Sequence, residues 1–104
     1  MPKYARPAVT RSVEAAIETF GNRVRVAVIG YLGDHSAADL AEIANEVGAS
    51  PATVHHHLRK LEELGLVITD PADPVKRNGV RIMYSRNTAA LRELYKQLGT
   101  ASRL

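Results

Sequence analysis

Residues 36–65 read SAADLAEIANEVGASPATVHHHLRKLEELG and contain two amphipathic segments separated by a short turn of small residues. In the first segment, apolar residues recur at the i, i+3, i+4, i+7 spacing of one helix face. We expect this helix to begin at Ser36, with Asp39 as its capping-box partner, and to end at Gly48, which suits a left-handed conformation. Ser50, followed by proline, then begins a second helix. Two short helices joined in this way form a helix-turn-helix.

The second helix, over about residues 50–64, has distinct apolar and polar faces when its residues are placed at about 100° intervals. Val54, Leu58 and Leu61 form the expected buried stripe. The opposite face carries short or hydrogen-bonding side chains near the helix start, as contact with base edges in a major groove requires. We therefore predict that this helix recognises double-stranded DNA. The residues assigned to this contact are Ser50, Ala52, Thr53, His55, His56, Arg59 and Lys60.

The three consecutive histidines in this helix raise the question of a metal site. Two ligands on one helix normally lie at i and i+4, where they share a face, whereas consecutive residues point in three directions. Only His35 or a second chain could add ligands, so we predict no metal and no other cofactor. Instead, we expect His57 on the flank of the apolar stripe and the other two at the DNA. The alternative is that His55 and His56 are ordinary solvated residues.

Composition indicates one small folded domain with no cysteine chemistry. The chain has 104 residues, of which 45% are hydrophobic and none is cysteine, so disulfides and thiolate metal sites are excluded. No apolar run approaches the roughly 18 residues of a membrane span, and the polar, basic start does not resemble a secretion signal. We therefore expect a cytoplasmic, nucleoid-associated protein with no membrane partner.

Charge is segregated along the chain, although the net charge is only +3. Residues 1–30 contain five basic and two acidic residues, whereas residues 34–48 contain four acidic and no basic ones. Such segregation can present one basic face to phosphates, and residues 1–9 are interpreted as a basic N-terminal arm. Any single one of these charges is equally compatible with an ordinary solvated surface.

The segment after the second helix has the pattern of a β-hairpin with a long loop. Residues 66–69 are β-prone, residues 80–86 alternate in polarity, and TDPADPVKRNG between them has two prolines and an Asn-Gly pair. This predicts a wing over about residues 66–86. Its basic loop suits phosphates or a narrow minor groove, although a plain surface loop is also basic. The wing residues assigned to DNA are Lys76, Arg77, Asn78 and Arg81.

Two helices are expected before the motif. Thr10 or Ser12 begins the first, which ends at Gly21. Residues 22–33, NRVRVAVIGYLG, favour a second helix ending at Gly33, with a buried strand as the alternative.

A last helix, capped by Thr88, is expected over about residues 88–98. Because one small domain has limited use for apolar helices at both ends, we expect the first and last helices to pair with those of a second copy. Two recognition helices would then meet a palindromic or pseudo-palindromic site. The alternative is that both stripes close the protomer's own core. The dimer residues expected are Val13, Ala16, Ile17, Phe20, Leu91, Leu94, Tyr95 and Leu98.

The predicted fold class is thus α+β, mostly α: a winged helix-turn-helix over residues 10–99 with terminal dimerisation helices and a tail at 100–104. The segment SPATVHHHLRKLEELGLV, preceded by DLAEIANEVG and RVRVAVIGYLG, resembles the ArsR-type winged-helix repressors of bacteria and archaea. The resemblance covers about residues 22–87 and centres on the pattern S-x-x-T-V-x-x-H-L-x-x-L-x-x-x-G-L-V. It implies a homodimeric DNA-binding regulator, with its first and last helices at the dimer interface and the hairpin as its wing. It also implies that His55, His56 and Arg59 enter the major groove.

The chain departs from the metal-sensing members of that family. They carry a cysteine pair on the first helix of the motif, or Asp and His ligands on the last helix, TAALRELYKQLG here, which has neither. The resemblance therefore implies the DNA-binding scaffold without the known sensor sites, and any effector is unknown. The positions that correspond to the cysteine-bearing segment are Ala37, Ala38, Asp39 and Leu40.

The function predicted is a sequence-specific transcriptional regulator, a repressor, acting as a homodimer on double-stranded DNA. An enzyme is disfavoured because the sequence has no cysteine, no G-x-S-x-G motif and no phosphate-binding glycine loop. The alternatives are a DNA-organising protein for plasmid or phage partition or transfer, and a protein-interaction module. Basic residues in the wing and the N-terminal arm favour nucleic acid over a pure protein adaptor.

Overall fold

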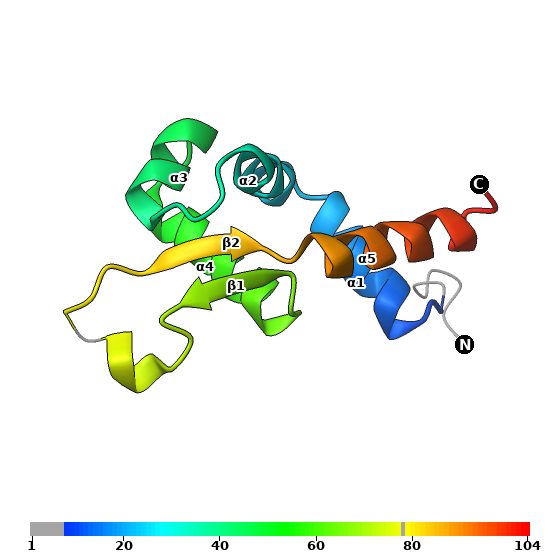
Figure 1. Cartoon of the computed structure of the whole chain (residues 1–104). Helices are drawn as coiled ribbons and strands as arrows, with labels where there is room; N and C mark the ends of the chain where they lie inside the picture. Colours follow the sequence, from blue (N-terminus) through cyan, green and yellow to red (C-terminus); the bar gives the residue numbers. More distant parts are fainter. Residues whose placement is uncertain (1–7, 78) are drawn as a thin grey trace, which may run out of the picture.

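The computed structural model describes residues 8–77 and 79–104. In these residues, α2, α3 and α4 gather beside a two-stranded antiparallel sheet, while α1 and α5 lie side by side at one end of an elongated molecule of 51 × 28 × 28 Å (Figure 1). This is the winged helix-turn-helix that the sequence predicts. The elements are α1 (Arg11–Phe20), α2 (Arg23–Asp34), α3 (Leu40–Val47), α4 (Pro51–Glu63), β1 (Val67–Asp70), the 3₁₀ helix η1 (Pro74–Arg77), β2 (Met83–Arg86) and α5 (Thr88–Ala101).

The hydrophobic core lies under α4. Val54, Leu58 and Leu61 are fully buried, as their spacing predicts, and they belong to one cluster with Val28 of α2 and Ile43 of α3. Burying an aliphatic side chain of this size contributes about 1.5–3 kcal/mol relative to leaving it exposed. The orientation of α4 is therefore set by apolar packing against the two preceding helices.

Helix α3 begins at Leu40, so the predicted start at Ser36 is wrong. Asp39 is the N-cap, and its side chain accepts a hydrogen bond from a first-turn amide at 2.9 Å. The preceding residue, Ala38, forms an antiparallel bridge with Tyr84, with N···O distances of 2.9 and 2.8 Å. Because the backbone groups of Ala38 are bonded across to the hairpin, the segment before Asp39 does not continue the helix.

The predicted start of α1 and the helical interpretation of residues 22–33 are confirmed. Thr10 caps α1, and its side chain accepts from the amide of Val13. Asn22 caps α2 in the same way, with an N···O distance of 3.1 Å to the amide of Arg25. These caps satisfy amides that would otherwise lack partners at the helix starts.

Gly33 lies inside α2 rather than at its end, which corrects the sequence prediction. A Cβ atom at this position would lie 2.5 Å from Nη1 of Arg86. The Arg86 guanidinium is held there by hydrogen bonds to the carbonyl of Ile29 (3.2 Å) and to Oγ1 of Thr88 (3.0 Å). The glycine therefore serves close packing between α2 and the end of the hairpin.

Two further boundaries differ from the sequence prediction. Asn87, not Thr88, caps α5: its side-chain oxygen accepts from a first-turn amide at 3.2 Å, and its Nδ2 donates to the carbonyl of Gly65 at 3.1 Å. The helix then continues through Gly99 to Ala101. In the wing, β2 pairs with β1 only over Met83–Arg86, so residues 80–82 of the predicted strand belong to the loop.

Candidate nucleic-acid interface

The outward face of α4 carries the side chains assigned to DNA from the sequence. Ala52, Thr53, His55, His56, Arg59 and Lys60 are all exposed, on the side opposite the buried stripe. At the helix start, Oγ of Ser50 accepts from the Thr53 amide at 3.2 Å and donates to the Thr53 hydroxyl oxygen at 2.9 Å. Pro51 follows at the first helical position, where no amide is needed. The start of α4 is thus fixed by its own residues.

Three side chains on this face have no competing bonds. Within the described residues, His55, His56 and Arg59 form no hydrogen bond and no ion pair. Arg59 presents a planar set of donors, and each imidazole presents one donor and one acceptor when neutral. Ligand contact by these groups requires no internal bond to be broken.

His57 differs from its two neighbours. It is half-buried, and its Nδ1 accepts a hydrogen bond from Nε of Arg25 at 3.0 Å. Burial lowers the pKa of the His57 imidazole below its ordinary value, and the positive charge of Arg25 lowers it further. The neutral ring is therefore a packing and hydrogen-bonding element between α4 and α2, on the flank of the apolar stripe. No group of three or more metal-ligating side chains is assembled in residues 8–77 and 79–104.

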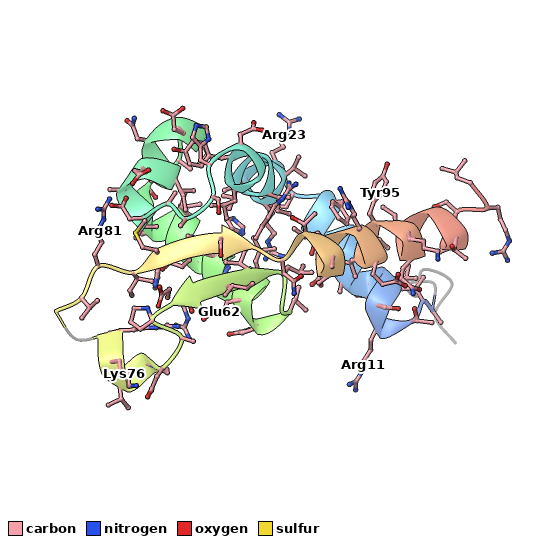
Figure 2. All side chains as sticks on the ribbon, in the orientation of Figure 1. Arg11, Arg23, Glu62, Lys76, Arg81 and Tyr95 are labelled. Carbon is pink, nitrogen blue, oxygen red and sulfur yellow. The ribbon has the colours of Figure 1, made fainter. Side chains whose placement is uncertain are left out.

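In the wing, Lys76 is the exposed cation. Figure 2 shows Lys76 on η1, at the outer end of the loop and away from the helices. Its side chain forms no hydrogen bond or ion pair with the described part of the chain. The neighbouring Val75 is 85% exposed. Asn78, also assigned to DNA from the sequence, lies outside the described residues, as do residues 1–7 of the expected basic arm.

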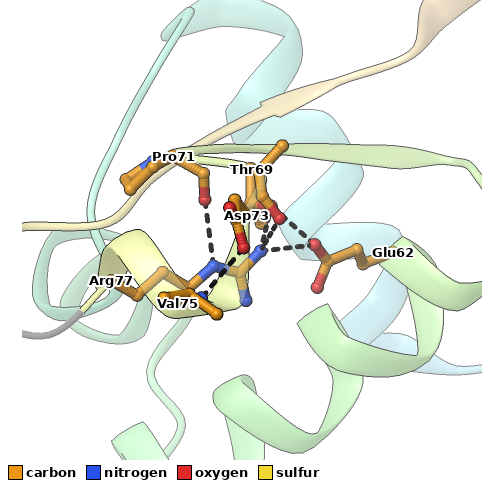
Figure 3. Close-up of polar contacts among 7 residues, drawn as sticks. Glu62, Thr69, Pro71, Asp73, Val75 and Arg77 are labelled. Atoms are coloured by element: carbon orange, nitrogen blue, oxygen red, sulfur yellow. Dashed lines mark hydrogen bonds and ion pairs between the residues drawn. The ribbon is translucent and has the colours of Figure 1, made fainter.

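Arg77 does not extend from the loop tip as the sequence suggests. Its guanidinium turns back toward α4, where Nη2 lies 2.9 Å from Oε2 of Glu62 (Figure 3). The same nitrogen donates to the hydroxyl of Thr69 at 2.6 Å, and Nε donates to the carbonyl of Pro71 at 2.9 Å. Sequence reasoning missed Glu62 because the acid and the arginine are brought together only by the folding of the wing onto α4.

Arg81 is also engaged within the protein. Its Nε donates to Asp39 at 2.7 Å and its Nη2 to Glu42 at 3.0 Å, although 65% of the side chain remains exposed. A backbone hydrogen bond from Glu42 and a side-chain bond from Arg81 together lower the pKa of Asp39 below its ordinary value. Both wing arginines assigned to DNA are thus bound to acids, one to α4 and the other to the start of α3.

The residues assigned to a dimer interface fall into two groups. Val13, Ala16 and Leu91 are already buried within the protomer, where the alternative interpretation put them. Ile17 and Tyr95 are 46% and 66% exposed. Phe20, Leu94 and Leu98 are half-buried, and the Phe20 ring packs edge-on against Tyr95 at a centroid distance of 5.4 Å. Figure 2 shows Tyr95 projecting from α5.

Similar structures share this fold. The antimony-specific transcriptional repressor AntR superposes with a TM-score of 0.63 at 20% identity, covering 97% of this chain and 90% of that one. Lactococcus lactis ZitR in complex with DNA gives 0.51 at 20% identity, covering 96% and 57% of the two chains. NadR in complex with 4-hydroxyphenylacetate gives 0.51 at 18% identity, covering 99% and 82%. A search of curated proteins found no match.

The family comparison is more specific. Residues 22–69, from the cap of α2 into β1, match the family model described as bacterial regulatory protein, arsR family. Proteins of this description are transcription regulators rather than enzymes, and no helix of the described chain is long and apolar enough to cross a membrane. Its helix-turn-helix makes the chain a DNA-binding transcriptional regulator, and residues 22–69 belong to the arsR family.

Proposed function

We propose that this chain represses transcription by binding a specific double-stranded DNA sequence as a homodimer, with α4 in the major groove. The observation that carries this proposal is the outward face of α4, where His55, His56 and Arg59 are exposed and unbonded above a fully buried apolar stripe. A rigid helix with free donors near its N-terminal half suits base-edge readout. The likeness in fold to AntR, described as a repressor, and to ZitR, solved with DNA, supports it.

The wing extends the proposed contact surface. Lys76 is exposed at the outer end of the loop and suits a phosphate, a contact that adds affinity without base information. The other contacts proposed from α4 are those of Ser50, Ala52, Thr53 and Lys60. In this arrangement α4 supplies specificity and the wing supplies general affinity.

The arm formed by α1 and α5 supports the homodimer. It lies at the opposite end of the long molecule from the wing loop (Figure 1), and it carries exposed apolar groups at Ile17 and Tyr95. A second copy on a two-fold axis would cover these groups with the same surface. The two α4 helices would then meet half-sites about one helical turn apart, which makes a palindromic or pseudo-palindromic site the expected target.

The DNA target is tested by selecting bound fragments from random double-stranded DNA and titrating the selected site. Arg59→Ala should weaken binding to that site by about 1–3 kcal/mol, the value of one good bidentate base contact, and should leave the fold unchanged. Arg92→Ala is the matched control, since Arg92 is exposed on α5, away from this face. Selection without any preferred sequence would favour a DNA-organising protein instead, and unchanged affinity of Arg59→Ala would remove α4 from the groove.

The homodimer is tested separately by sedimentation. Ile17→Asp places a charge on the exposed apolar part of the arm and should convert dimers to monomers at micromolar concentration. Val75→Asp makes a similar change at an exposed residue of the wing and should leave the mass unchanged. A wild-type protein that sediments as a monomer would contradict the paired-helix arrangement.

A further inference from the structure

We propose that Arg77 and Glu62 form a latch that holds the wing loop against α4, so that both residues position the wing for DNA without touching the DNA. The latch is defined as Arg77, Glu62 and Thr69. The inference rests on the proposed use of α4 and the wing as the DNA-binding surface. It gives Arg77 an internal role in place of the phosphate contact expected from the sequence.

The contacts of the latch connect three parts of the molecule (Figure 3). Glu62 lies on α4, Thr69 on β1 and Arg77 at the end of η1. Oε2 of Glu62 accepts from Nη2 of Arg77 at 2.9 Å and from the Thr69 hydroxyl at 2.5 Å. Nη2 of Arg77 also donates to Thr69 at 2.6 Å, so the three side chains form a closed triangle.

The same guanidinium closes the loop on itself. Nε of Arg77 donates to the carbonyl of Pro71 at 2.9 Å, and Nη2 donates to the carbonyl of Ala72 at 3.2 Å. The start of the loop, its end and α4 are thus bound to one side chain. Thr69 beneath them is only 4% exposed, so the triangle rests on a buried floor.

The environment favours a stable charged pair. Exposure is 23% for the Arg77 side chain and 32% for the Glu62 side chain, lower than for a free surface pair. Burial raises the pKa of the Glu62 carboxyl, but hydrogen bonds from Thr69 and Arg77 outweigh burial, and the pKa lies below its ordinary value. The carboxylate is therefore ionised at neutral pH and accepts charge-assisted hydrogen bonds, the stronger kind.

The latch bears on Lys76 through η1. Asp73 closes this short helix, with its carbonyl accepting from the Lys76 amide and its carboxylate from the Val75 amide, each at 3.0 Å. Arg77, the last residue of η1, fixes this turn to α4. Lys76 is thereby held at the outer end of an ordered loop. A loop that is ordered before binding loses less conformational freedom on binding, which raises affinity for every DNA sequence.

Removing the charge of Glu62 separates this role from simple electrostatics. A carboxylate near DNA repels phosphates, so electrostatics alone predicts that Glu62→Gln tightens binding. The latch predicts the opposite sign, because the loop is loosened. Glu63 is the matched control: it is the adjacent acid on α4, its side chain is 59% exposed, and its ion-pair partner is Lys60 at 3.8 Å.

The experiment is a DNA titration at several salt concentrations with wild type, Glu62→Gln, Arg77→Gln, the double variant and Glu63→Gln. We expect each latch variant to bind all sequences roughly 3- to 10-fold more weakly, as fits the loss of one charge-assisted hydrogen bond. The double variant should be no weaker than the singles, and the slope of log affinity against log salt should not change. Glu63→Gln should bind as well as wild type or better.

Two results of the titration overturn the latch. One is tighter or unchanged binding by Glu62→Gln. The other is a salt slope that falls by about 0.9 in Arg77→Gln, which is the signature of a lost phosphate contact.

Amide hydrogen exchange in the free protein gives a readout that needs no DNA. Exchange in residues 70–77 should be faster in both latch variants, while exchange at core residues such as Leu58 stays at the wild-type rate. Unchanged exchange in the loop overturns the latch, and faster exchange with unchanged DNA affinity overturns its positioning role. If the wild type binds no DNA, the proposed function fails while the exchange result still decides whether the latch exists.

Discussion

The recognition helix and the wing are held to the protein by different means. Val54, Leu58 and Leu61 anchor α4 by complete apolar burial, whereas the wing loop is held by the polar contacts of Arg77 with Glu62. An apolar anchor leaves the polar side chains of α4 free for a ligand. A loop with few buried residues instead uses its own charged groups to hold itself in place.

The two arginine-bearing surfaces illustrate the consequence. Arg59 on α4 forms no hydrogen bond or ion pair within residues 8–77 and 79–104, while Arg77 and Arg81 in the wing are both bound to acids. A basic residue in a DNA-binding wing is therefore not by itself a phosphate contact. Its role depends on whether an acid from another element lies within reach.

The largest expected effect comes from breaking the apolar anchor. Leu58→Ala removes a fully buried side chain and should lower the free energy of unfolding by about 2–5 kcal/mol. DNA binding should fall with the folded fraction. Leu64→Ala is the control, because Leu64 is 44% exposed at the end of the same helix and its truncation leaves little cavity. Urea unfolding measures both, and equal losses in the two variants would contradict an anchor specific to the buried stripe.

An intermediate effect is expected when the free cation of the wing is removed. Lys76→Ala should lower affinity for all DNA sequences and reduce the salt slope by about 0.9, as expected for one phosphate contact. Lys96→Ala, an exposed lysine on α5, should change neither quantity. This result would contrast with Arg77→Gln, for which only affinity should fall. If Lys76→Ala leaves the slope at its wild-type value, the wing does not contact phosphates.

The smallest effect is expected from titration of the imidazole that joins α4 to α2. Because the pKa of His57 is lowered in the folded state, the unfolded chain binds more protons below pH 6.5, its ordinary pKa. This stabilising contribution is complete above that pH and is lost as the pH falls toward the folded pKa. Protonation also removes the Nδ1 acceptor that Arg25 uses.

Melting temperature measured between pH 7.5 and 5 tests this effect. His57→Gln should flatten the decline seen in the wild type, whereas His55→Gln, at an exposed and unbonded position, should not. An identical decline in wild type and His57→Gln would show that other groups control stability in this range.

The parts of the fold that the sequence predicts well are those specified by nearby residues. The cap at Ser50 and the apolar stripe of α4 depend on spacings of three or four positions, so both follow from local patterns. The start of α3 was predicted wrongly because Ala38 pairs with Tyr84, which a local pattern does not reveal. The free face of α4 was likewise predictable from helical periodicity.

The candidate site in the wing was less predictable for the same reason. Its basic residues are evident in the sequence, but the acids that engage Arg77 and Arg81 come from α4 and α3. Only the folded arrangement shows that Lys76 remains available while its neighbour does not. Composition identified the right segment, and long-range contacts decide which of its residues are free.

Gly33 and Arg86 also constrain how this sequence can vary. Alanine normally favours a helix interior over glycine by about 1 kcal/mol, but a methyl group at position 33 would displace the Arg86 guanidinium from the Ile29 carbonyl and the Thr88 hydroxyl. The usual preference is therefore reversed as long as arginine occupies position 86. Among homologous sequences, larger residues at position 33 should accompany a shorter side chain at position 86, so the pair would covary although neither residue lies in the proposed DNA-binding surface.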